Sequence, residues 1–88
     1  MKKRILVLAR RDIYEAIRVA AGLTIRNNAV DFVFMKKAPL NAQGKIEHFE
    51  MLELAEIHPQ SLIDSIPDTT PCTDLGQLIS QADRVVSF

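Results

Sequence analysis

The chain has few cysteines and few glycines, and each shortage excludes a class of protein. Cys72 is the single cysteine among 88 residues, which excludes an intramolecular disulfide and paired CxxC metal ligands. The turn after the first aliphatic run, Arg10-Arg11-Asp12, contains none of the 3 glycines. This turn is therefore neither a Walker loop nor a dinucleotide-binding loop. A phospho-receiver domain is also excluded, because it needs acidic residues directly after the first strand to hold Mg²⁺, and Arg10 and Arg11 stand there instead.

The sequence also lacks an excess of charge and any long hydrophobic run. Its 11 Lys+Arg residues balance 11 Asp+Glu residues, so we expect no direct nucleic-acid partner. The apolar run 5–9 is too short for an export signal, and no later run is long enough to span a membrane. Together with the single cysteine, these absences predict a cytoplasmic protein without membrane contact.

The length and composition fit one small globular domain. The 88 residues are 48% hydrophobic and 25% charged, which predicts a single domain spanning 1–88. A domain of this size buries only about 60% of its unfolded surface, so its core is marginal. We therefore expect the chain to associate with copies of itself or with a partner.

The first half of the sequence predicts a strand, a helix and a second strand. The run 4–9 (RILVLA) is typical of a strand covered on both faces. Asp12 and Glu15 form a capping box for a helix whose apolar residues recur at helical spacing, and 30–35 (VDFVFM) is the second strand. This βαβ unit predicts parallel strands joined by a right-handed crossover.

The second half predicts two further helices and a closing strand. A helix over 46–57 would turn Met51, Leu52, Leu54 and Ala55 inward and Glu50, Glu53 and Glu56 outward, and Pro59 would end it. The segment 60–66 is either the third strand or, as we favour, a short helix, and 67–71 is a loop with a brief extended part. Asp74 and Gln77 cap a helix ending near Ala82, and 84–88 is the closing strand. The predicted fold class is α/β, a small three-layer sandwich with a mostly parallel sheet of about four strands flanked by helices.

Four basic residues are candidates for ligand binding. Open parallel sheets bind ligands at the carboxyl ends of their strands. Arg10 and Arg11 follow the first strand, and Lys36 and Lys37 open the loop after the second. We predict an anion site there, with solvated surface charge as the alternative.

Cys72 is the candidate catalytic residue. It lies two positions ahead of Asp74, where the partial charge of a helix terminus can stabilise a thiolate that attacks a persulfide or disulfide. The alternative is a small buried hydrophobic residue, and Asp74 would oppose thiolate formation. His48 and His58 are ten positions apart on the predicted helix and do not share a face, so we expect no metal and no cofactor.

The sequence resembles one known family. It contains LGQL at 75–78 and ADRVVSF at 82–88, and chains of the DsrE/TusD branch of the DsrE/DsrF/DsrH superfamily end in a similar LGxL helix and DRVVxF strand. The segments 15–23 (EAIRVAAGL) and 30–35 are similar to the family's opening βαβ unit. The resemblance implies a largely parallel α/β fold, assembly as a trimer, a hexamer or a complex of related DsrE-family subunits, and contact with sulfur-relay proteins.

In some members of this family a cysteine carries a persulfide. That cysteine lies mid-chain, in a region corresponding to 57–70 of this sequence, which is shortened and contains no cysteine. Cys72 does not match it. The favoured hypothesis is therefore a non-catalytic or regulatory DsrE-like subunit, and the alternative is a thiol-based sulfur carrier that uses Cys72.

Overall fold

The computed structural model describes residues 3–38, 40–63 and 66–88. Over these residues the chain forms an α/β domain with a five-stranded, all-parallel sheet in the order β4-β3-β2-β1-β5. The elements are β1 (Arg4–Ala9), α1 (Ile13–Ile25), β2 (Ala29–Phe34), α2 (Phe49–Leu54), β3 (Gln60–Ser61), β4 (Thr70–Pro71), α3 (Leu75–Gln81) and β5 (Arg84–Ser87). The predicted class is confirmed, with five strands in place of about four because β4 is a separate, two-residue strand.

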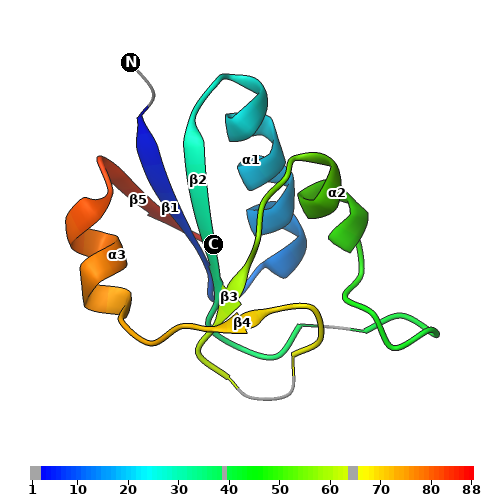
Figure 1. Ribbon diagram of the computed structural model, residues 1–88. Coiled ribbons are helices and arrows are strands. Elements are labelled where there is room, and N and C mark those ends of the chain that lie inside the picture. Colours follow the sequence, from blue (N-terminus) through cyan, green and yellow to red (C-terminus); the bar gives the residue numbers. More distant parts are fainter. Residues whose placement is uncertain (1–2, 39, 64–65) are drawn as a thin grey trace.

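The helices cover both faces of the sheet, giving three layers. Figure 1 shows α1 and α2 on one side and α3 on the other. Because side chains alternate along a strand, Ile5 and Val7 of β1 point toward α1 and α2, whereas Leu6 and Leu8 point toward α3. The five residues Ile5–Ala9 are all buried, as a strand covered on both faces requires.

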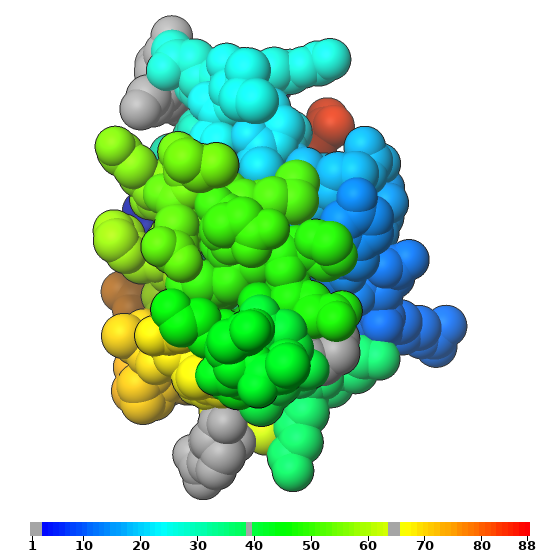
Figure 2. All heavy atoms as spheres, turned by 90° about the vertical axis from the view of Figure 1, so that its right-hand side faces the viewer, coloured from blue at the N-terminus to red at the C-terminus, as the bar shows by residue number. Residues whose placement is uncertain are grey.

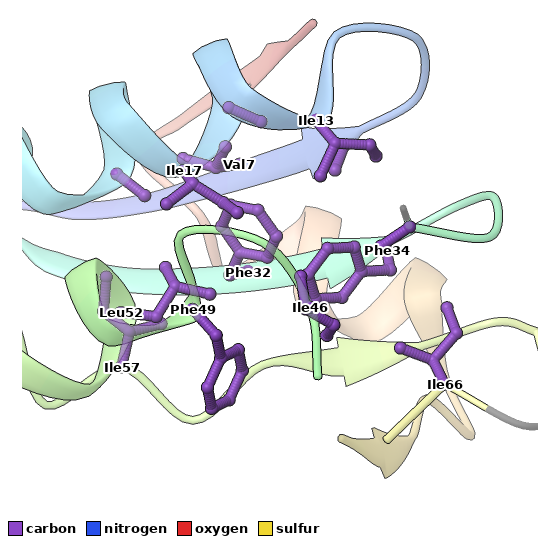
Figure 3. Close-up of a cluster of buried hydrophobic side chains, with 14 of the residues drawn as sticks. Val7, Ile13, Ile17, Phe32, Phe34, Ile46, Phe49, Leu52, Ile57 and Ile66 are labelled. Carbon is purple, nitrogen blue, oxygen red and sulfur yellow. The ribbon is translucent and has the colours of Figure 1, made fainter. Parts of the chain in front are cut away.

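The larger core lies between the sheet and helices α1 and α2. Phe32 and Phe34 of β2 are almost completely buried, and their ring centroids are 4.9 Å apart in an edge-to-face arrangement. Figure 3 shows these two rings between Ile17 of α1 and residues contributed by the second half of the chain. The latter include Ile46, Phe49, Leu52, Ile57 and Ile66.

The smaller core lies under α3. Leu6, Leu8 and Val33 are buried there, and the partly buried residues Met35, Cys72, Leu75, Leu78 and Ala82 pack against them. None of the seven residues of α3 is itself buried. The third layer is therefore thin, a single short helix over the middle of the sheet.

The predicted cap residues of α1 and α3 are confirmed, but among the described residues the Glu15 and Gln77 side chains do not return a hydrogen bond to them, and the Glu15 carboxylate pairs with Arg18. The carboxylate of Asp12 accepts a hydrogen bond from the N–H of Glu15 at 3.0 Å, and Asp74 accepts one from Gln77 at 2.9 Å. At the other end of α1, Asn27 has φ 63° and the N–H of Asn28 donates to the Leu23 carbonyl. This arrangement closes the helix in the left-handed conformation that asparagine tolerates.

Helix α2 is shorter than the predicted helix over 46–57. Ile46 forms an isolated antiparallel bridge with Leu40, so the chain reaches Phe49 as a loop. At the other end Glu56 has φ 58° and the N–H of Ile57 donates to the Leu52 carbonyl at 2.9 Å, a closure that precedes Pro59. Leu54, predicted to point inward, is 85% exposed.

The short helix favoured for 60–66 is wrong, although 64–65 lie outside the described residues. Gln60–Ser61 form β3, parallel to β2, and the Ser61 hydroxyl accepts the N–H of Ile63 at 3.0 Å in the turn that follows. The brief extended part predicted within 67–71 is confirmed as β4. The apolar spacing of 60–66 fits a strand and a helix equally well, and pairing with β2 decides for the strand.

Polar contacts of Arg4 hold the closing strand and β2 to the start of β1. The backbone N–H of Arg4 donates to the Asp83 carboxylate at 2.8 Å, and the Asp83 N–H donates to the Arg4 carbonyl at 2.7 Å. The Arg4 side chain bonds Asp31 at 2.7 Å, which explains the one charged residue in β2. That hydrogen bond, and then the charge of Asp31, raise the pKa of Arg4.

Candidate functional site

The carboxyl ends of β1 and β5 meet where the chain changes direction across the sheet. From β1 the chain moves outward through β2, β3 and β4, and α3 then carries it back to β5 on the other side of β1. Such a switch point is the usual ligand site of an open parallel sheet. Here it holds a hollow of about 270 Å³ lined by Arg10, Arg11, Ser87 and Phe88.

The backbone donors beside this switch-point hollow already take part in hydrogen bonds within the chain. The N–H groups of Arg10 and Arg11 both donate to the carbonyl oxygen of Phe88, at 2.8 and 2.6 Å. Two adjacent N–H groups would otherwise be suitable donors for an anion. The hollow can therefore offer a ligand the arginine side chains, which are exposed, but not these backbone donors.

A larger hollow opens one strand further along, between the ends of β1 and β2. It measures about 680 Å³ and is lined by Arg11, Asp12, Ile13, Tyr14, Lys36, Lys37 and Ala38. We call it the basic hollow. Three of the four predicted ligand-binding residues, Arg11, Lys36 and Lys37, line it together. Arg10 lines the switch-point hollow instead, so the predicted set is divided, with Arg11 shared.

Charge and free donors in the basic hollow favour an anion. Three cationic side chains face one carboxylate there, and an oxygen of that carboxylate, from Asp12, already accepts the capping hydrogen bond. The hollow also contains the first turn of α1, where the helix dipole is positive. The N–H groups of Ile13 and Tyr14 in this turn have no acceptor among the described residues.

Tyr14 forms an aromatic wall of the basic hollow. Its ring is half exposed, and it lies against His48 with ring centroids 4.5 Å apart at an angle of 49°. His48 has φ 63° and directly precedes α2, so this contact joins the loop after β2 to α1. Sequence reasoning missed Tyr14 as a site residue. Its position in the first turn of the predicted helix, beside Arg11, was the available signal.

Cys72 lies away from the basic hollow. It directly follows β4, and its N–H donates to the Ser61 carbonyl at 2.8 Å. Its half-buried side chain belongs to the smaller core under α3, with Met35 and Leu75. Since β3 and β2 separate β4 from β1, the structure does not bring the thiol together with Arg10 or Arg11.

Glu53 of α2 and Glu56, which follows the helix, line a further hollow, which we call the acidic hollow. Glu53 and Glu56 border a space of about 490 Å³ together with Lys45, His58 and Asp68. Within residues 3–38, 40–63 and 66–88, no three metal-ligating side chains gather at one point. All three glutamates of the predicted acidic face, Glu50, Glu53 and Glu56, are exposed.

None of the helices in the described part of the chain is long and apolar enough to span a membrane. Comparison with protein-family models, curated proteins and solved structures finds no match to this chain. The residues of the basic hollow and the surroundings of Cys72 are therefore the features that bear on function.

Proposed function

We propose that this chain is a non-catalytic, DsrE-like subunit that binds a small anion in the basic hollow. One observation carries the proposal: Arg11, Lys36 and Lys37, which come from two different loops, line a single hollow over the first turn of α1. Its volume of about 680 Å³ lies in the range of small-molecule sites. The free N–H groups of Ile13 and Tyr14 add directional donors for a phosphate or sulfate group.

The surroundings of Cys72 support a subunit without thiol chemistry. An activated thiolate needs a cationic neighbour, a base or an accessible helix N-terminus. Cys72 packs in an apolar cluster with Met35 and Leu75, and the nearby cap residue Asp74 is acidic. We assign Cys72 a packing role in the core under α3.

Assembly, with copies of itself as a trimer or hexamer or with related DsrE-family subunits, is part of the proposal. Parallel sheets are stable when both faces are covered. Here the α3 layer is thin, and Ile79 and Val85 on that side are 45% and 40% exposed. A cytoplasmic subunit that contacts sulfur-relay proteins is the role that the DsrE-like resemblance implies.

The anion site is tested by titrating the ¹⁵N-labelled protein with inorganic phosphate and following its amide NMR signals. We expect saturable shifts centred on Arg11, Ile13 and Tyr14, and loss of most of the affinity in the Lys36→Ala/Lys37→Ala variant. Lys45→Ala is the matched control, because Lys45 lines the acidic hollow and should leave phosphate binding unchanged. Equal affinity in wild type and the double variant would refute the site.

The absence of thiol chemistry is tested separately by intact-mass spectrometry. The reduced protein and a Cys72→Ser variant are incubated with a persulfide donor that is shown to be active on another thiol. We expect no mass increase in either protein. Gain of one sulfur atom by the wild type alone would establish a persulfide-forming thiol and favour the sulfur carrier.

A further inference from the structure

An apolar groove runs between α1 and α2 on the outer face of the helix layer. It measures about 430 Å³ and is lined by Ala21, Thr24 and Ile25 on the α1 side and by Met51, Leu54 and Glu56 on the α2 side. Figure 2 looks onto this face, with the end of α1 in cyan beside the green and yellow-green residues of α2 and its C-terminal turn. The groove shares Glu56 with the acidic hollow and no residue with the basic hollow.

The two sides of this groove carry the most exposed large hydrophobic residues of the described chain. Ile25 on the α1 side is 86% exposed, and Leu54 on the α2 side is 85% exposed. A single exposed aliphatic residue needs no explanation. Two of them on opposite rims of an apolar groove form a contiguous patch of the kind that marks a protein contact.

Opposite charges lie beside these two hydrophobic residues. Arg26, directly after Ile25, is exposed on the α1 side, and Glu56 is exposed two residues after Leu54 on the α2 side. Neither takes part in a salt bridge among the described residues. On the α2 side the charged residue, Glu56, lines the groove itself. On the α1 side Arg26 is the chain neighbour of the lining residue Ile25, and the two charges have opposite sign.

We infer that this groove is a twofold contact between two copies of the chain. A twofold axis running along the groove would place the α1 side of one copy over the α2 side of the other. Ile25 then meets Leu54, Arg26 meets Glu56, and each contact occurs twice. A second copy is the occupant that supplies both the apolar and the charged complement from the same surface. The inference deepens the assembly part of the proposed function and does not depend on the anion site.

The backbone at Glu56 supports a role for its carboxylate. Glu56 has φ 58° at the position after α2 where glycine is usual, and side chains other than glycine are strained there. Strained residues are retained where the surrounding structure or a function requires them. Glu56 lines the groove, so in the twofold contact its carboxylate would lie opposite the Arg26 of a second copy.

A charge exchange across the contact tests the inference. Sedimentation equilibrium measures the dimer dissociation constant of the full chain for wild type, Arg26→Glu, Glu56→Arg and the double variant. Each single change places like charges together twice, so we expect dissociation constants raised roughly tenfold or more. The double variant restores opposite charges and should return close to wild type. A monomeric wild type, or a double variant as weak as the single ones, would overturn the contact.

Two further variants distinguish this contact from other assembly surfaces. Leu54→Asp should abolish the dimer, whereas Ile79→Asp, a half-exposed position on α3, should leave the groove contact intact. Circular dichroism confirms that each variant is folded. If Leu54→Asp assembles to the same size and with the same dissociation constant as the wild type, the groove contact is overturned.

The phosphate titration separates this inference from the anion site. The dimer-breaking variants should bind phosphate as the wild type does, and Lys36→Ala/Lys37→Ala should dimerise normally. A wild type that binds phosphate but stays monomeric would refute the groove contact and leave the anion site standing. A wild type that dimerises but does not bind phosphate would refute the anion site and leave the groove contact standing.

Discussion

Replacing Glu56 by glycine should stabilise the protein. Glu56 occupies the left-handed conformation that closes α2, where the N–H groups of Glu56 and Ile57 donate to the carbonyls of Glu53 and Leu52. These two hydrogen bonds, which run from the residues just after the helix back to its last turn, form a Schellman motif. Glycine is strongly favoured at the left-handed position of this motif. The glutamate side chain makes no hydrogen bond or salt bridge among the described residues that would offset the strain.

The size of the effect follows from two opposing contributions. A side chain costs roughly 1–2 kcal/mol in the left-handed conformation. Glycine costs about 0.5–1 kcal/mol through its larger freedom in the unfolded chain. The central values of these two ranges differ by about 0.75 kcal/mol, so Glu56→Gly should raise the free energy of unfolding by roughly 0.5–1 kcal/mol. For a domain of this size that gain corresponds to roughly 2–8 °C in Tm.

Urea unfolding followed by circular dichroism measures this gain. The protein concentration must lie below the dimer dissociation constant, so that any loss of the groove contact does not enter the comparison. Glu56→Ala is the matched control, because it removes the carboxylate and keeps the strained conformation, and we expect it within about 0.5 kcal/mol of wild type. A Glu56→Gly protein no more stable than Glu56→Ala would show that the turn carries no strain.

Three further changes test the fold. Gly22→Ala should add about 0.5–1 kcal/mol to the free energy of unfolding, because Gly22 is exposed on α1 and an added Cβ meets nothing within 4 Å; a loss would indicate a hidden contact. Leu6→Ala should lower the free energy of unfolding in urea by about 2–5 kcal/mol, since Leu6 is fully buried. Leu75→Ala, at a half-buried position of α3, should cost less, and an equal loss would contradict a thin α3 layer. Asp12→Ala should cost about 1 kcal/mol, with Asp12→Asn close to wild type; equal loss in both variants would argue against capping.

The sequence predicted the elements whose signals are local. The buried run of β1 and the capping residues Asp12 and Asp74 define their own elements, and the structure agrees with them. The two-residue strand β3 could not be told from a helix in this way, and β4 could be placed only as a brief extended part of 67–71, because pairing to a neighbour distant in sequence defines both strands. The early end of α2 was missed for a similar reason, since a left-handed glutamate is not a pattern that sequence reasoning expects.

The candidate site was predicted in part. Arg11, Lys36 and Lys37 were expected to meet because the carboxyl ends of parallel strands share one edge of the sheet, and the structure brings them together. The separation of Arg10 depends on the order of the strands, in particular on β5 lying beside β1. The apolar groove was not predicted, because it depends on the exposure of Ile25 and of Leu54, and periodicity had placed Leu54 on the inward face of its helix.

The place of β5 in the sheet has a consequence for synthesis on the ribosome. β1 is a central strand whose two neighbours, β2 and β5, are separated by about fifty residues of intervening chain. As the nascent polypeptide emerges, β1 can pair early with β2, but its other side stays an open aliphatic edge until 84–87 are made. Such an edge invites pairing with other chains, so chaperone demand and aggregation in the cell should depend on this late strand.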